Sequence, residues 1–444
     1  MKIFGLSKIT TILTIATLAL ASCGTVAEAK STTISPVDTV VNGPSAPGIT
    51  DSSILLGSYQ PLTGPVAPGY NEIAPAMEAF FKYVNSFGGI YGRKVTLYYQ
   101  PEQYNQATTL KVVKQLVQKY NVFAIVDGFG TWTHQSAGRY LNQKQIPDLF
   151  VGSGCGCWNL PTFYPYTFGL SPSYITQGRI IGKVINKKFP NAKVGVIYQD
   201  DDSATDGLLG LRQALGPNTI VATQSYNPSS LSSGLLSQIQ TFKASGVNLI
   251  VSFSSPEATA LELVAEGELG VKVTTFTPAM SADPQSLAEL IDTLSSGKVY
   301  GSSAVEGVYS LTFLPTLASP NDPWIKLFTK VHARYDSALP LDDNTVYGMS
   351  IAYLTSEALM HSGRNLTRQS VVTWLNKPGS ALRGPGLVPL SYNPTNHQGY
   401  SGAQLTEVQN GRSTPLGPIY IIDSRGRVTV THSQELPPKR SFLK

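Results

Sequence analysis

Short β-rich runs alternate with longer amphipathic stretches through most of this 444-residue chain. The run Ile54–Tyr59 is typical of a strand, and in residues 71–87 apolar side chains recur at the spacing of one helix face. The same order repeats with a strand at Lys94–Tyr99 and a helix at Gln106–Lys119. Strands that alternate with helices predict a parallel sheet covered by helices, which is an α/β fold.

The alternation begins again after about Pro172 and follows a similar order. We therefore expect two doubly wound parallel-sheet lobes of one architecture. The strands expected in the second half are Val194–Tyr198, Val221–Tyr226, Ile250–Phe253, Thr274–Thr277, Tyr300–Gly307, Leu405–Val408 and Ile419–Asp423. The helices expected there are Tyr174–Lys188, Gly207–Leu215, Leu231–Ala244, Glu257–Leu269, Asn321–Tyr335, Thr345–His361 and Thr367–Leu375.

The first residues are typical of an export signal rather than of a fold. Two lysines precede the apolar run Ile9–Ala21, which is too short to span a bilayer comfortably. Its end, Leu20–Gly24 (LASCG), resembles the bacterial lipoprotein box, and the resemblance implies a diacylglycerol on the Cys23 thiol. An ordinary secretion signal with a chance cysteine is the alternative. We expect a signal peptide at residues 1–22 and a flexible tether at residues 23–49.

Composition excludes two classes of protein. Removing the signal peptide takes away two lysines and lowers the formal net charge from +5 to +3. This mild charge, without a basic stripe interleaved with aromatic residues, does not predict a nucleic-acid partner. No other stretch is apolar for long enough to cross a membrane, so we expect an exported protein held at the membrane through its lipid alone.

Two of the three cysteines, Cys155 and Cys157, lie one residue apart. An exported protein meets oxidising conditions, which permit a disulfide between them. The sequence leaves this disulfide and a pair of packed thiols as equal alternatives. Two thiolates without clustered histidines fall short of the four ligands of a structural zinc site, so no metal is expected.

Six short motifs occur in a fixed order between about residues 50 and 425. They are Gly57–Gly64 (GSYQPLTG), Asn85–Val95 (NSFGGIYGRKV), Ile146–Gly154 (IPDLFVGSG), Val196–Asp202 (VIYQDDD), Glu306–Val308 and Leu366–Arg368. Each motif alone is weak, but the ordered set resembles the branched-chain-amino-acid-type substrate-binding proteins of ABC transporters. That resemblance implies the type I periplasmic-binding-protein fold.

The resemblance also implies that the chain crosses between the lobes three times, near Leu170–Ser173, Gly301–Ala304 and Gln398–Ala403. Lobe one is then expected to hold residues 50–171 and 303–398, and lobe two residues 172–301 and 400–425. Residues 426–444 are expected to form a C-terminal tail.

In open α/β sheets a ligand binds beyond the carboxyl ends of the strands, where loops lead into helix N-termini. The loop Gly128–Thr133 follows the third expected strand, and its glycines allow a ligand to approach the backbone. In proteins of the resembled family a Ser or Thr of this loop holds the ligand carboxylate, and Thr131 matches, with Thr133 second. Capping of the following helix is the alternative for both. Trp132 is expected either to stack on the ligand or to pack in the lobe.

The next loop of the same lobe is Gly152–Cys155. The resemblance implies carboxylate binding through backbone N–H groups and a small hydroxyl side chain, which points to Ser153 and Gly154. Cys155 stands where many relatives carry Thr or Ser, and this departure weakens any transfer of ligand identity. A tight turn without a ligand is the alternative.

Lobe two departs from the family pattern in two places. After the acidic pair that includes Asp202, relatives place an aromatic residue, whereas this chain has Ser203. The loop Ala279–Asp283 includes the expected contacts Met280 and Ser281, and Asp283 is its only acid that could pair with a ligand ammonium. Asp201 and Asp202 are the alternative partners, although acids in such loops are more often solvated or cap a helix. The sequence therefore favours a carboxylic acid or amide without the usual α-amino group. Ser254 is expected either to contact the ligand or to cap a helix.

The motifs of common enzyme classes are missing, since the chain has no Gly-x-Ser-x-Gly, P-loop or His-Glu-x-x-His. We therefore expect no enzyme and no cofactor. The expected function is capture of a small carboxylate-bearing ligand by lobe closure outside the cytoplasm, and delivery to an ABC permease. A sensor that uses the same lobes to signal to a receptor is the alternative.

Overall fold

The computed structural model describes residues 46–64, 66–423 and 425–431. All of them belong to one compact unit. The expected signal peptide, Cys23, most of the tether and the last residues of the tail lie outside the described residues.

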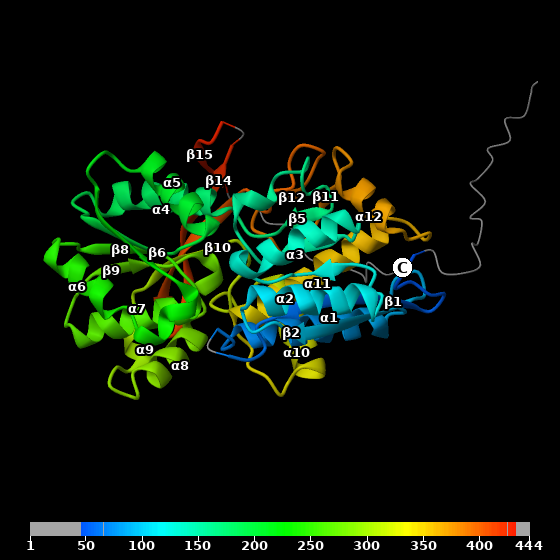
Figure 1. Cartoon of the computed structure of the whole chain (residues 1–444), viewed down its shortest axis with the longest axis horizontal. Coiled ribbons are helices and arrows are strands. Elements are labelled where there is room, and N and C mark those ends of the chain that lie inside the picture. Colours follow the sequence, from blue (N-terminus) through cyan, green and yellow to red (C-terminus); the bar gives the residue numbers. More distant parts are fainter. Residues whose placement is uncertain (1–45, 65, 424, 432–444) are drawn as a thin grey trace, which may run out of the picture. The chain divides into compact units, whose positions relative to one another are not determined.

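The first half of the chain forms a five-stranded parallel sheet with the strand order β2-β1-β3-β4-β5. We call this sheet and the helices packed around it the first lobe (Figure 1). Its strands are β1 (Ser53–Gln60), β2 (Lys94–Pro101), β3 (Ile125–Val126), β4 (Asp148–Val151) and β5 (Thr167–Gly169). Its helices are α1 (Ile73–Ser86), α2 (Gln106–Gln118), α3 (Thr131–Gln143), α10 (Pro323–Tyr335), α11 (Asp343–His361) and α12 (Arg368–Leu375).

The second lobe is built on an eight-stranded sheet with the order β15-β14-β13-β10-β9-β8-β6-β7, parallel from β10 to β7 and antiparallel from β10 to β15. Its strands are β6 (Val194–Gln199), β7 (Ile220–Tyr226), β8 (Leu249–Phe253), β9 (Thr274–Phe276), β10 (Tyr309–Thr312), β13 (Gly402–Gln409), β14 (Arg412–Ile422) and β15 (Val428–Thr431). Its helices are α4 (Tyr174–Lys188), α5 (Asp202–Ala214), α6 (Leu236–Ala244), α7 (Pro256–Glu268), α8 (Pro284–Leu294) and α9 (Gly301–Ala304).

Short elements complete the described chain. The 3₁₀ turns are η1 (Tyr70–Glu72), η2 (Gly156–Trp158), η3 (Pro228–Ser233) and η4 (Ala279–Ser281), and a small two-stranded sheet joins β11 (Ala381–Leu382) to β12 (Leu390–Ser391).

Most helices form where apolar spacing and a capping residue agree. In α1 the buried face follows the predicted spacing, with Ile73, Met77, Phe80 and Val84 all inaccessible to solvent. Side chains that accept a hydrogen bond from a first-turn N–H begin seven of the other described helices. These N-cap residues are Asn105 for α2, Ser173 for α4, Ser255 for α7, Asp283 for α8, Asp322 for α10, Asp342 for α11 and Thr367 for α12.

One predicted element is wrong. Residues 300–307 were expected to form a strand, but Gly301–Ala304 is the helix α9, which begins where the Gly301 N–H donates to Asp292 Oδ1 over 2.8 Å. The strand comes later, as β10, and pairs with β9 and β13. Because β10 belongs to the second sheet, the chain leaves this sheet after Thr312 rather than near Gly301–Ala304. The other lobe boundaries stay predictions.

Candidate ligand site

Loops from both lobes enclose a cavity of about 40 Å³. This volume is small beside the roughly 300–1,000 Å³ of common ligand pockets, so a ligand larger than a few waters requires side chains or lobes to move apart. The residues that line it are Tyr70, Tyr104, Phe129, Gly130, Thr131, Gly152, Tyr174, Gln199, Phe253, Ser254, Ser255, Pro278, Met280 and Ser281.

The first lobe supplies the loops that follow β3 and β4, at the carboxyl ends of two neighbouring parallel strands. Gly130 has a φ of 85°, a left-handed conformation that suits glycine, and it starts α3 at the cavity wall. The Thr131 and Ser153 hydroxyls share a hydrogen bond of 2.7 Å. The N-terminus of α3 and the Thr131 hydroxyl at one edge provide uncharged donors for an anion.

The second lobe supplies the loops that follow β8 and β9. The Ser281 hydroxyl donates to the Ser254 backbone oxygen over 2.6 Å and thereby ties the two loops together. The Tyr70 hydroxyl of the first lobe donates to the Met280 backbone oxygen over 2.7 Å. The two halves of the cavity are therefore in direct contact at this point.

The residues proposed from sequence divide into three groups. Thr131, Ser254, Met280 and Ser281 line the cavity. Ser153 lies directly behind Thr131, and its hydroxyl accepts from Trp158 Nε1 and from the Cys155 N–H, both over 3.1 Å.

The other proposed residues are not part of the cavity wall. The Thr133 hydroxyl bonds to the Phe129 backbone oxygen, as expected for a residue of the first helical turn. The Trp132 backbone oxygen accepts from Gln106 Nε2. Gly154 and Cys155 continue away from the cavity toward η2, and Asp202 is exposed at the start of α5. Ser203 lies in the first turn of α5, and its side chain is not among the described ones.

Sequence reasoning missed the aromatic wall of the cavity, formed by Tyr70, Tyr104, Tyr174, Phe129 and Phe253. It also missed Gln199. A signal for Gln199 existed, because this residue ends β6 and the carboxyl ends of parallel strands were the places to search. The tyrosines come from three separate loops and helix starts, which no local pattern relates to one another.

No Asp, Glu, Lys or Arg is among the described residues that line the cavity. Asp201 contacts the wall from outside, because it accepts a hydrogen bond of 2.6 Å from Nε2 of the lining residue Gln199. Burial raises the pKa of Tyr174 to about 12, and the charge of Asp201 adds to the shift. The Tyr174 hydroxyl therefore stays protonated at neutral pH.

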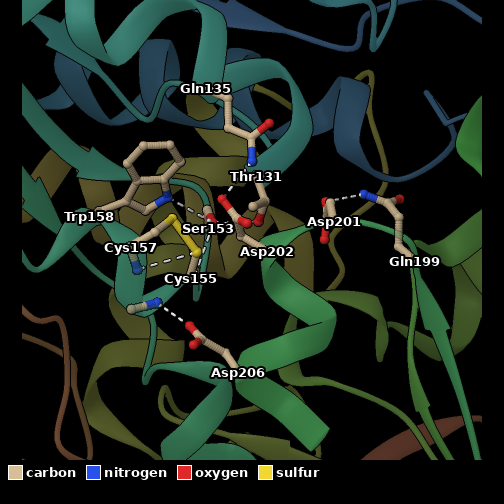
Figure 2. The surroundings of a disulfide bond; sticks show 11 residues. Thr131, Gln135, Ser153, Cys155, Cys157, Trp158, Gln199, Asp201, Asp202 and Asp206 are labelled. Atoms are coloured by element: carbon tan, nitrogen blue, oxygen red, sulfur yellow. Dashed lines mark hydrogen bonds between the residues drawn. A yellow bond between two sulfur atoms is a disulfide. The ribbon is translucent and has the colours of Figure 1, made fainter. Parts of the chain in front are cut away.

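Behind the cavity, Cys155 and Cys157 form a disulfide (Figure 2). The sequence alone had left this disulfide and a pair of packed thiols as equal alternatives. His134, next to the ligand loop, is fully buried, with its ring nitrogens at the Tyr59 hydroxyl and, over 3.0 Å, at Asp148 Oδ2. It is not part of the cavity wall, so it supports the loop from inside the lobe.

Residues 46–64, 66–423 and 425–431 contain no group of three or more His, Cys, Asp or Glu placed to hold a metal ion. Within the same part of the chain no helix combines the length and the apolar character that crossing a membrane requires.

Comparison with known proteins agrees with this geometry. The family model described as "Periplasmic binding protein" matches residues 53–413. The chain belongs to the periplasmic binding protein family. A relative of this periplasmic binding protein, the Leu/Ile/Val-binding protein homolog 7 of Brucella suis, is 22% identical over 327 residues, which cover 71% of this chain and 78% of the relative.

Two solved structures share the fold of this periplasmic binding protein. A branched-chain amino acid ABC transporter protein from Thermus thermophilus with bound valine has a TM-score of 0.69 at 19% identity, covering 83% of this chain and 96% of that one. A solute-binding protein from R. palustris in complex with benzoate also has a TM-score of 0.69, at 14% identity, covering 88% and 100%. These likenesses confirm the predicted type I periplasmic-binding-protein fold.

Proposed function

We propose that this periplasmic binding protein captures a small carboxylate that lacks an α-amino group and presents it to an ABC permease. The observation that carries the proposal is the cavity wall, where hydroxyls and a helix N-terminus meet aromatic rings and none of the described lining residues is acidic. Hydroxyl and N–H donors stabilise a carboxylate without a cation. An ammonium taken from water is best paired with a carboxylate, and no Asp or Glu is among the described residues of this wall.

The aromatic wall suits a ligand with an apolar or aromatic body. Rings from the first lobe and from α4 stand around the same space as Thr131, so a carboxylate at Thr131 would direct the rest of the ligand toward them. The R. palustris protein that binds benzoate provides a precedent within the fold.

An α-amino acid is the second candidate, and Asp201 is the observation that favours it. Its carboxylate bonds to Gln199, which does line the cavity. A rotation of Gln199 would bring an ammonium within reach of Asp201. In that case the ligand would resemble the valine bound by the Thermus thermophilus protein.

A thermal-shift screen separates the two candidates. The panel pairs carboxylates with their α-amino counterparts, such as phenylpropanoate with phenylalanine and isovalerate with valine, and includes benzoate. A ligand at 100 times its Kd stabilises the folded state by about 2.7 kcal/mol. We expect shifts from the plain acids, lost in Thr131→Val and retained in Asp201→Asn. Shifts from the amino acids alone, lost in Asp201→Asn, would support the second candidate, and no shift from either series would contradict the proposal.

Membrane attachment and transport complete the proposal. We propose that Cys23 carries a diacylglycerol and that the closed lobes are recognised by a permease. Labelling with a radioactive fatty acid should mark the full chain and not Cys23→Ser. The sensing alternative is distinguished by neighbouring genes, because permease and ATPase genes indicate transport, whereas a kinase gene indicates signalling.

A further inference from the structure

The loop that follows β4 makes two sets of hydrogen bonds. One set lies toward the cavity, and the other joins the loop to the second lobe. Toward the cavity, the Cys155 N–H donates to the Ser153 hydroxyl, which shares a hydrogen bond with Thr131. Directly beyond, Cys155 and Cys157 are joined by the disulfide and enclose Gly156 in a small ring. The position of this ring is therefore coupled to the ligand-facing hydroxyls.

The ring faces α5 of the second lobe. The Gly156 N–H donates to Asp206 Oδ2 over 2.5 Å, and one turn earlier Gln135 Nε2 of α3 donates to Asp202 Oδ2 over 2.8 Å (Figure 2). Asp206 is half-buried, whereas Asp202 is exposed. Burial raises the pKa of Asp206, while the hydrogen bond from Gly156 opposes the shift and thus favours the carboxylate.

Glycine at position 156 makes the close approach feasible. A Cβ atom there would lie 3.0 Å from Asp206 Oδ2, tighter than an ordinary contact. Glycine also has the largest backbone conformational entropy of any residue. Without the disulfide, the Cys-Gly-Cys segment would therefore seldom direct the Gly156 N–H toward Asp206. The disulfide removes that freedom before the lobes meet.

We infer that the Cys155–Cys157 ring and Asp206 form a latch between the lobes, in which Asp206 is a positioning residue and the ring presents the Gly156 N–H only while the disulfide is intact. That the latch closes over a ligand rests on the proposed function. The latch itself is a contact between two parts of the chain and can be measured without a ligand.

The latch links lobe contact to the redox state of the cysteines. In a glutathione buffer, two glutathione thiols give two electrons and two protons to the Cys155–Cys157 bond, which becomes two thiols while one glutathione disulfide forms. If Asp206 binds the oxidised ring better than the open segment, it must stabilise the disulfide by the same factor, because coupling between two equilibria is reciprocal.

The test measures the equilibrium between the disulfide and the two thiols in glutathione buffers, by mass spectrometry after alkylation. The protein is the full chain with Cys23→Ser, so that only the two ring cysteines react. Asp206→Ala should make the disulfide about 3- to 10-fold easier to reduce, since a hydrogen bond to a charged group is lost. Asp206→Asn keeps an acceptor oxygen, so its disulfide should be easier to reduce than that of the wild type and harder to reduce than that of Asp206→Ala.

Asp202→Ala is the matched control, because it removes the same charge from the same helix without touching the ring. We expect it to change the equilibrium less than twofold. If Asp202→Ala and Asp206→Ala shift the disulfide equilibrium equally, the effect comes from the loss of a negative charge near the ring and not from the latch contact, and the proposal fails. If Asp206→Ala leaves the equilibrium unchanged, the latch is refuted. Both outcomes are independent of ligand binding, so the latch and the proposed function fail separately.

Discussion

The Ser153 hydroxyl lies at the centre of a buried group of hydrogen bonds behind the cavity. It accepts from Trp158 Nε1 and from the Cys155 N–H, and it shares a bond with Thr131. The Trp158 side chain is buried, and its indole N–H can only donate. Loss of the hydroxyl therefore leaves a buried donor without a partner.

We predict that Ser153→Ala lowers the free energy of unfolding by about 1–3 kcal/mol, the cost of an unsatisfied buried polar group. Urea denaturation followed by tryptophan fluorescence measures the change. Ser237→Ala, on the exposed start of α6, is the control and should stay within about 0.5 kcal/mol. An unchanged urea midpoint in Ser153→Ala would show that the hydrogen bonds to Ser153 are dispensable.

At the scale of single residues the sequence predicted part of the cavity wall. Thr131 was found because it follows a strand, begins a helix and matches a family motif, and all three facts are local. Tyr70, Tyr104 and Tyr174 were missed because each is an ordinary aromatic residue in its own segment. They become a wall only when the loops of two lobes meet, which depends on the tertiary path of the chain.

Helices α4 and α5 pack closely because glycines line the surface between them. A Cβ atom on Gly210 would lie 2.1 Å from the Ile175 backbone oxygen, and one on Gly178 would lie 2.5 Å from the Gly207 backbone oxygen. Any side chain at these positions forces backbone to move. Because α5 also carries Asp206, the distance between the two helices sets where the latch carboxylate stands.

We predict that Gly210→Ala destabilises the protein by about 1–3 kcal/mol, as overpacking typically does, although alanine favours a helix over glycine by about 1 kcal/mol. Urea denaturation gives the sign directly. Gly216→Ala is the control, because the nearest atom to its Cβ, Thr219 Oγ1, lies 3.7 Å away and its backbone needs no left-handed conformation. A more stable Gly210→Ala would mean that the two helices separate at little cost.

Elements with strong local sequence signals were predictable. Helix α9 was not, because a tertiary contact determines its structure. Residues 300–307 were expected to form a strand, yet Gly301 packs so closely that a Cβ would lie 2.0 Å from the Ala288 backbone oxygen. The Asp292 side chain of the preceding helix then holds the Gly301 N–H. This contact between two consecutive helices overrides the local preference, and sequence alone does not contain its geometry.

Over the whole molecule, buried carboxyl groups collect between the lobes. Asp283 begins α8 of the second lobe, and its Oδ2 accepts from the Asp343 N–H of the first lobe over 3.2 Å. Burial, with the charges of Asp342 and Asp343, raises the pKa of Asp283 to about 8. Elsewhere burial raises the pKa of Asp127 to about 7 and of Glu262 to about 8. At neutral pH the folded protein therefore holds protons that the unfolded chain releases.

The sign of the pH dependence follows from these protons. A carboxyl whose pKa is higher in the folded state binds more protons there, so stability falls as pH rises from the unfolded value near 4 to the folded value. Each such group contributes up to about 1.4 kcal/mol per pH unit within its window. We predict a lower urea midpoint at pH 8 than at pH 6, with Asp283 at the lobe contact and the carboxyls inside the lobes all contributing.

The matched variant that tests this origin is Asp283→Asn, which keeps the N-cap oxygen for α8 but carries no charge. We expect it to flatten the decline between pH 6 and pH 8, and its advantage over the wild type to be largest at pH 8. Glu78→Gln, on the surface beside Lys82, should retain the full decline. If Asp283→Asn shows the wild-type pH dependence, ionisation of Asp283 at the lobe contact does not limit stability at high pH. The decline must then be assigned to groups inside single lobes, such as Asp127 and Glu262.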